Sequence, residues 1–210
     1  MLKIENLRIG ELKANCYIIG NDKECIVVDP GSDAIKDLEL IKKIIDGRNC
    51  KAIILTHSHF DHIDGAHAFE QITTYTHVEE IKTLKSQQVI SKMFTGKTLI
   101  LPKKVSELEK HMKFGKIEFE VIHTPGHTKG GVCLLFNNKF MLTGDTLFKE
   151  TYGRTDVGGN DKEMYASLQM LAEMNDEIII YPGHGRSTIL GNEKRWIREL
   201  PKPNTQTKSP

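Results

Sequence analysis

The chain has 210 residues, of which 39% are hydrophobic and 27% are charged, and its formal net charge is +1. This length suits one substantial core, and the balanced composition excludes a largely disordered protein. The charge gives no electrostatic footprint for nucleic acid or an anionic membrane as a partner. We therefore expect one domain over residues 1–200, and a disordered tail over 201–210, where Pro, Thr and Lys predominate.

Targeting and redox signals are sparse. No apolar run is long enough to cross a bilayer, and the first residues lack the apolar core of a signal peptide, so a cytoplasmic location is expected. The four cysteines form no C-x-x-C pair, which argues against a disulfide framework or a thiolate zinc site. Three of them lie in or beside apolar runs and are expected to be buried as small hydrophobic residues.

The first thirty residues contain three short apolar segments, which run over residues 2–9, 16–19 and 25–28 and are separated by turns. This spacing predicts three antiparallel strands. The third segment ends at Asp29 in the turn Asp-Pro-Gly. That carboxylate either bonds its own backbone in the turn or supports a site beyond the strand.

A helix is predicted next, because apolar residues recur at helical spacing from Ile35 to Ile45 and Gly47 then stops the pattern. Ser32 or Asp33 is expected to cap its start. The helix leads to a short aliphatic run over residues 51–55, which is typical of a buried strand.

The most informative stretch follows that strand and reads Thr56-His57-Ser58-His59-Phe60-Asp61-His62. His57 and His59 are two positions apart at a strand end, so their side chains point to the same side and can share one ion. Asp61 and His62 follow where the chain turns into a helix, and they can serve a second ion. Zinc and iron are bound in proteins by imidazole and carboxylate groups. Three histidines and one aspartate rarely occur so close together in an ordinary polar loop, so this stretch predicts a metal site.

The middle of the chain is less regular. We expect a helix over residues 63–70 and a short strand over 72–75. Between 77 and 101 the apolar pattern weakens, with helical pieces at 78–85 and 88–93 that Gly and Pro interrupt. This segment is expected to form either a mobile lid or a wall beside the entrance to the site, or else a surface segment with no role in the site.

Strand patterns return over residues 105–123 and deliver His127 in a Pro-Gly-His-Thr turn. A hairpin formed by residues 132–142 then delivers Asp145. A helix over 163–174 and a buried strand over 177–181 follow, and that strand delivers His184. A last short helix fits residues 192–200.

Four strand ends therefore each deliver residues that could bind a metal. A single Pro-Gly-His would be weak evidence, because Pro-Gly forms turns and histidine tolerates them. Together the four strand ends predict one shared site, and its candidate residues are His57, His59, Asp61, His62, His127, Asp145 and His184.

These motifs resemble those of the metallo-β-lactamase fold hydrolases, and among them the glyoxalase II type. T-H-x-H-x-D-H appears at residues 56–62, P-G-H-T at 125–128, G-D-T-L-F at 144–148 and the final G-H at 183–184. The resemblance covers nearly all of residues 1–190. It implies a four-layer α/β/β/α sandwich, in which two mixed sheets pack face to face, helices lie outside and the metals lie at one sheet edge.

The resemblance also implies how the ligands divide between two divalent ions, for which zinc is expected and iron or manganese is the alternative. The first ion would be held by His57, His59 and His127, the second by Asp61, His62 and His184, with Asp145 bridging them. By the same resemblance, Asp29 does not bind a metal itself but holds in place the metal loop, residues 56–62, which carries four of the ligands. A hydroxide that bridges the two ions would attack a polarised carbonyl, and Asp61 would orient it.

The implied substrate is a small thioester such as S-lactoylglutathione. The chain resembles short bacterial relatives that lack the helical domain of typical glyoxalase II enzymes, so the substrate contacts are sought in loops. Arg154 could grip a substrate carboxylate, or instead pin its loop to Asp156 or Asp161. Lys149 and Arg186 are candidates of the same kind, with a solvated position as the alternative.

Two other functions fit the sequence. A persulfide dioxygenase acting on glutathione persulfide would hold a single iron with His57, His127 and Asp145. A metal-binding protein without enzymatic activity would keep the site for stability alone, but seven candidate ligands leave more room for solvent than a closed structural site does. Neither a nucleic acid nor a membrane is expected as a partner, and the oligomeric state is left open.

Overall fold

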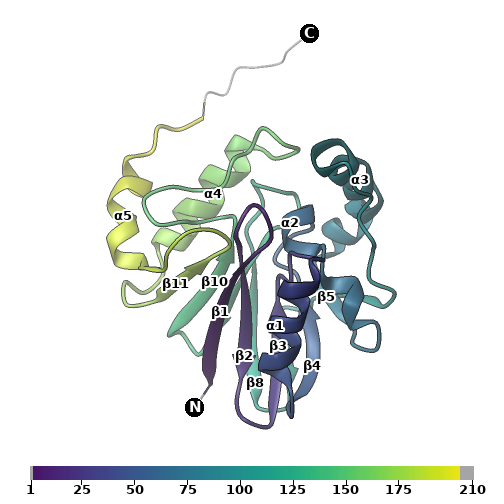
Figure 1. Cartoon of the computed structure of the whole chain (residues 1–210). Helices are drawn as coiled ribbons and strands as arrows, with labels where there is room; N and C mark the ends of the chain where they lie inside the picture. Colours follow the sequence, from purple (N-terminus) through teal and green to yellow (C-terminus); the bar gives the residue numbers. More distant parts are fainter. Residues whose placement is uncertain (1, 204–210) are drawn as a thin grey trace.

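The computed structural model describes residues 2–203 and consists of two six-stranded sheets with helices on their outer faces. Figure 1 shows the strands in the middle of the molecule, with α1, α2 and α3 on one side and α4 and α5 on the other. This is the α/β/β/α sandwich that the resemblance implied, and the predicted fold class is confirmed.

The first sheet has the strand order β1-β2-β3-β4-β5-β6. The pairs β1/β2 and β2/β3 are antiparallel, as predicted, while β3, β4, β5 and β6 run parallel to one another. Its strands are β1 (Lys3–Ile9), β2 (Ala14–Gly20), β3 (Glu24–Val28), β4 (Asn49–Ile54), β5 (Thr74–Thr76) and β6 (Val105–Glu107).

The second sheet has the order β12-β11-β10-β9-β8-β7, and only the pair β10/β11 is parallel. The hairpin predicted over 132–142 is β9 and β10, and its turn residues Asn137 and Asn138 both have positive φ, as a two-residue hairpin turn of type I′ requires. The strands are β7 (His111–Phe114), β8 (Ile117–His123), β9 (Val132–Phe136), β10 (Phe140–Gly144), β11 (Ile179–Pro182) and β12 (Thr188–Ile189).

Three apolar clusters hold the four layers together. The central cluster lies between the sheets and includes Ile54, Phe119 and Phe136. A second cluster packs the first sheet against α1, α2 and α3, and a third packs the second sheet against α4 and α5. The helices are α1 (Ile35–Ile45), α2 (Phe60–Ile63), the short 3-10 helix η1 (Ala66–Phe69), α3 (Val78–Thr95), α4 (Asp161–Ala172) and α5 (Leu190–Glu199).

Several local expectations need correction. Residues 77–101 do not form two helical pieces, because α3 is one continuous helix of 18 residues that ends at Gly96 in the left-handed conformation. The helix expected over 63–70 is wrong: α2 ends at Ile63, and the rest of that range holds only the 3-10 helix η1. Neither Ser32 nor Asp33 is the N-cap of α1, since that position is Ala34.

The predicted disordered tail lies mostly in residues that the structure does not describe. Residues 204–210 of the expected disordered tail lie outside the described residues. The short strand β12 pairs with β11 through only two residues, so it left no periodic pattern to find. Among the helices of residues 2–203, none is both long and apolar enough to cross a membrane.

Candidate metal centre

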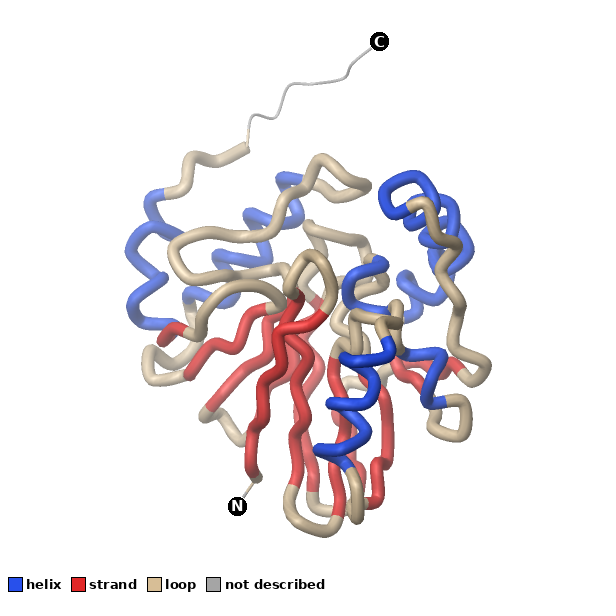
Figure 2. The backbone as a smooth tube through the Cα atoms, viewed as in Figure 1, coloured by secondary structure: helices blue, strands red, loops and turns tan. Residues whose placement is uncertain are grey.

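The expected ligands follow strands that end at the same edge of the sandwich. His57 and His59 follow β4, and Asp61 and His62 lie in α2 directly after them. In the second sheet β8, β10 and β11 run in one direction, since β9 is antiparallel to both β8 and β10. Their carboxyl ends therefore deliver the loops with the remaining ligands to one place, where Figure 2 shows loops gathered at the ends of the strands.

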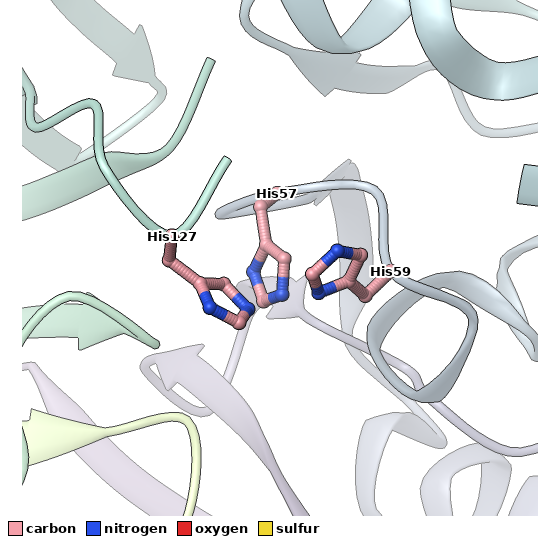
Figure 3. A group of neighbouring side chains, drawn as sticks. All are labelled: His57, His59 and His127. Carbon is pink, nitrogen blue, oxygen red and sulfur yellow. The ribbon is translucent and has the colours of Figure 1, made fainter. Parts of the chain in front are cut away.

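His57, His59 and His127 form the first group. Figure 3 shows the three rings converging although His127 comes from a distant part of the chain. Their ring centroids are 4.5–4.8 Å apart. One nitrogen of each ring lies within 4.8 Å of the others, a spacing at which the three could hold one ion.

Asp61, His62 and His184 form a second group of the same kind, in which His184 Nε2 lies 3.1 Å from Asp61 Oδ2 and 3.3 Å from His62 Nε2. Asp145 lies between the groups. Its carboxylate oxygens are 3.4 Å from His62 Nε2 and 3.5 Å from His127 Nε2. The structure thus brings all seven predicted ligands together, with Asp145 in contact with both sets.

The donor atoms themselves fit a metal. Among the described residues, His57 Nε2, His127 Nε2 and Asp145 Oδ1 are buried and have no hydrogen-bond partner. Burying an unpaired polar atom costs about 1–3 kcal/mol, so three of them at one point call for a ligand. Imidazole nitrogens and carboxylate oxygens can both bind the same divalent cation.

In three of the histidines, His57, His62 and His127, the protein holds the Nδ1 nitrogen and so fixes the orientation of the ring. Thr56 Oγ1 lies 3.1 Å from His57 Nδ1, and Asp29 Oδ2 lies 3.0 Å from His62 Nδ1. His127 Nδ1 donates to the backbone carbonyl of Arg154 at 2.6 Å. All three rings therefore present Nε2 to the centre.

Asp29 supports the metal loop rather than its own turn alone. Its two carboxylate oxygens accept hydrogen bonds from the backbone N–H and the hydroxyl of Thr56 at 2.8 and 2.6 Å, besides the contact with His62. Its backbone lies in the left-handed region, with φ of 51°. Such a conformation is costly for a side chain other than glycine and is found most often where a site requires it.

Gly183 shows how closely the loops approach each other. A Cβ on this residue would lie 2.2 Å from Asp145 Oδ1 and 2.8 Å from His62 Cε1. No other amino acid has room there unless the site shifts. The glycine of the Pro-Gly-His motif is therefore required by the close packing of the loops at this site, and not only by the turn that it forms.

The electrostatics divide the histidines into two kinds. Burial and the neighbouring rings lower the pKa of His57 well below its usual value, and burial and His127 lower that of His59 to about 4. Burial would also lower the pKa of His62, but the carboxylates of Asp145, Asp61 and Asp29 outweigh it and raise that pKa to about 10. The first group is thus neutral and ready to bind, while His62 holds a proton.

The two carboxylates also differ. Burial raises the pKa of Asp145 above its ordinary value, and the surrounding histidines offset only part of that effect. For Asp61 burial acts in the same direction, but His62 and His184 dominate and hold its pKa below the ordinary value. Asp61 is therefore a hydrogen-bond acceptor at neutral pH.

Sequence reasoning missed Glu80, which is buried in α3 and 2% exposed. One carboxylate oxygen accepts hydrogen bonds from the backbone N–H and the hydroxyl of Ser58, between the two histidines of the first group. The other oxygen accepts from the N–H of Gly130 at 2.8 Å, in the loop that follows His127. Glu80 therefore ties together the two loops that carry the first group.

Asn15 and Tyr17 do the same for the last loop. The Asn15 side-chain amide donates to the carbonyls of Pro182 and Gly185 at 2.8 and 3.2 Å, and the Tyr17 hydroxyl donates to Pro182 at 2.7 Å. Both residues belong to β2, and nothing in the local sequence signals a contact with residues more than 160 positions away.

The three cationic candidates for substrate binding lie outside this cluster. The Arg154 side chain is exposed and forms a two-point ion pair with Asp156 at 2.7 Å, which is the loop-pinning alternative. Lys149 is half exposed and lies 3.8 Å from Glu150. Arg186 is exposed.

The chain is similar to proteins of known name and structure. It is 32% identical to hydroxyacylglutathione hydrolase GloC of Haemophilus influenzae, with 92% of this chain and 96% of that protein covered. Among solved structures, the BLEG-1 B3 metallo-β-lactamase has a TM-score of 0.80 and 32% identity, over 93% of this chain and 97% of that one.

A second solved structure bears on the metal. TTHA1623 in a di-iron-bound form has a TM-score of 0.80 and 30% identity, with 91% and 97% of the two chains covered. Residues 9–184 also match the family model of the metallo-beta-lactamase superfamily. With the fold and this match together, the chain belongs to the metallo-beta-lactamase superfamily.

Proposed function

We propose that the protein is a metal-dependent hydrolase that cleaves a small thioester. The observation that carries the proposal is the gathering of seven imidazole and carboxylate ligands into overlapping groups around buried, unpaired donor atoms. Two divalent cations bound there would lower the pKa of a water between them and polarise a substrate carbonyl. The name of GloC supports a thioester of the hydroxyacylglutathione kind as the substrate class.

The chain's own residues supply the rest of the chemistry. Asp61 is ionised and can accept a hydrogen bond from the attacking water, which orients it toward the carbonyl carbon. A thioester releases a thiolate, which needs less protonation than the nitrogen of an amide would. No strong general acid is then required beside the ligands.

A cysteine nucleophile is a poor alternative. Cys25 and Cys50 are register partners near the starts of β3 and β4, whereas the expected ligands follow the end of β4. Cys16 and Cys133 are fully buried, and burial raises the pKa of Cys133 to about 12. A thiol of that kind is neither accessible nor ionised near neutral pH. Water activated at the metal centre is therefore the nucleophile that we propose.

A second function deserves a test because the three unpaired atoms belong to His57, His127 and Asp145. Two histidines and one carboxylate are the ligand set of mononuclear non-haem iron oxygenases. A persulfide dioxygenase would use those three residues and leave Asp61 and His184 without a metal-binding role. The ligand-like packing of Asp61, His62 and His184 favours the hydrolase.

The two functions are separated by assaying zinc-, iron- and manganese-loaded protein on S-lactoylglutathione and on glutathione persulfide, with thiol release and oxygen uptake recorded together. We expect thiol release without oxygen uptake. Asp61→Asn should lower kcat by about a hundredfold, because a neutral amide oxygen is a weaker hydrogen-bond acceptor for the water, and a weaker metal ligand, than the carboxylate. Asp46→Asn, an exposed position at the end of α1, is the matched control and should leave kcat unchanged. Oxygen uptake with one iron per chain would contradict the proposal.

A further inference from the structure

A cleft of about 440 Å³ opens beside the metal centre, and Asp61 is part of its lining. One wall is the tip of the β1/β2 hairpin at residues 10–12, and the opposite wall is the end of α3 at residues 91–97. The loop that leads into α1 and the helix α2 complete it. A molecule that lies in this cleft can therefore reach the expected ligands with one end.

The cleft walls carry apolar side chains that the fold itself does not use. Leu12 is 56% exposed and Phe94 is 68% exposed, although both line the cleft. Phe94 stacks on Phe60 with ring centroids 6.3 Å apart and an angle of 20° between the planes. Phe60 lies between His59 and Asp61 in the sequence, so the apolar part of the wall begins beside the expected ligands and extends to Phe94 on α3, where the other lining residues are Ser91 and Thr95.

This cleft has firm walls. The backbone N–H of Gly10, at the hairpin turn, donates to Asp37 at 3.0 Å, and Ser32 donates to the same carboxylate oxygen at 2.7 Å. A Cβ on Gly31 would lie 1.6 Å from the carbonyl oxygen of Asp61, so the loop before α1 fits tightly against α2. The hairpin tip is therefore held in place beside the site.

The charges of the cleft do not suit an anionic ligand. Its acidic residues outnumber its basic ones, which are Lys36 and Lys97, and no arginine lines it. Lys36 and Lys97 are both exposed at the rim. Arginine is the residue that best binds a carboxylate through two hydrogen bonds, and the lining residues of the cleft include none.

We infer that this cleft binds the acyl chain of the substrate and that the chain is apolar and longer than a lactoyl group. The inference rests on the proposed function, because it takes the thioester carbonyl to lie at the metal centre. Leu12, Phe60 and Phe94 would enclose the chain and remove it from water. The apolar walls suit an acyl group better than a thiol carrier, because soluble thiol carriers owe their solubility to charged and polar groups.

The first test measures binding without any reaction. Straight-chain carboxylates from acetate to octanoate, which are the product acids of such thioesters, are titrated into the zinc-loaded protein by calorimetry. We expect the affinity to rise about fourfold per methylene until the cleft is filled. Equal affinity for every chain length would overturn the inference.

Variants assign that dependence to the cleft. Phe94→Ala should weaken octanoate binding about tenfold and leave acetate binding unchanged, because only the longer chain reaches the ring. Leu12→Ala should act in the same direction from the opposite wall. Met93→Ala is the matched control, since Met93 is the neighbouring residue on α3, is 79% exposed and does not line the cleft. If Met93→Ala weakened octanoate binding as much as Phe94→Ala does, the cleft would not be the site.

A second test uses S-acyl thioesters of one thiol, with acetyl, lactoyl, hexanoyl and octanoyl groups. Phe94→Ala should raise KM for the octanoyl thioester about tenfold, with kcat unchanged and no effect on the lactoyl thioester. If thioesters are hydrolysed without dependence on chain length, the acyl cleft fails and the proposed function stands. If carboxylates bind by chain length but no thioester is hydrolysed, the proposed function fails and the apolar cleft stands.

Discussion

At the scale of single residues, neighbouring histidines in this site have opposite acid–base behaviour. Burial and the neighbouring histidines lower the pKa of His57, whereas for His62, which is also buried, the carboxylates of Asp145, Asp61 and Asp29 outweigh burial and raise the pKa. An imidazole must be neutral to bind a metal, whereas a carboxylate binds as the anion. The proton on His62 therefore takes the place of a cation in the metal-free protein and neutralises part of the carboxylate charge.

This leads to a prediction for the metal-free protein at pH 8. One histidine ring should still be protonated, because the pKa of His62 is raised to about 10. Nitrogen NMR of histidine-labelled protein would show that imidazolium signal, and His62→Asn would remove it. If all nine histidines were neutral at pH 8, the electrostatic account of the site would be wrong.

The same shift fixes the sign of a stability effect. The pKa of His62 is higher in the folded state than the unfolded value of about 6.5. Protonation of His62 therefore stabilises the metal-free fold fully below about pH 6.5, and this contribution is lost as the pH rises through about 10. Bound metal would remove the dependence, since it displaces the proton.

The residue types of the site were readable from the sequence, but their neighbours were not. Seven ligand-type residues follow strand-like runs, five of them in turns or loops and Asp61 and His62 in the short helix α2, and this local signal led to all of them. Glu80 gave no signal, because a glutamate in a helical pattern is ordinarily solvent exposed. Arg154 was open to two interpretations, a substrate contact or an ion pair within its loop; the structure shows the pair with Asp156, and the contact of its backbone carbonyl with His127 left no signal in the sequence.

At the scale of elements, α3 shows why one helix was hard to predict. The buried residues of α3 are Leu84 and three polar residues, which are Glu80, Gln87 and Ser91. Apolar residues such as Val89, Met93 and Phe94 are exposed instead. The periodic apolar stripe by which a helix is recognised is therefore missing: Leu84 joins the core, and the other buried side chains of the helix are polar.

Glu80 gives α3 a testable role in metal binding. Glu80→Gln replaces one acceptor with an N–H donor that faces other donors, so the loops with Ser58 and Gly130 should loosen. We expect metal affinity to fall ten- to a hundredfold, measured by competition with a chromophoric chelator.

The matched control for that variant is Glu79→Gln. Glu79 is the neighbouring residue of α3, and its carboxylate pairs with Lys82 on the surface. This change should leave the affinity as it is. An unchanged metal affinity in Glu80→Gln would show that the two loops hold their ligands without α3.

At the scale of the whole molecule, the site exists because two sheets end at one edge. The ligands are spread from His57 to His184, and they meet only through the parallel pairing of β10 with β11 and the packing of the two sheets. Sequence motifs could predict that these residues share a site. Their division between ions, the support from β2 and the cleft beside α3 depend on tertiary contacts that no local pattern encodes.

The central claim is that this edge holds two ions and hydrolyses a thioester with them. It is tested most directly by titrating metal-free protein with zinc under an oxygen-free atmosphere while thiol release from an acyl thioester is recorded. The account predicts that activity rises until two equivalents per chain are bound and needs no oxygen. Activity that was complete at one equivalent of zinc, or that was absent with zinc and appeared only when iron and oxygen were supplied instead, would contradict it.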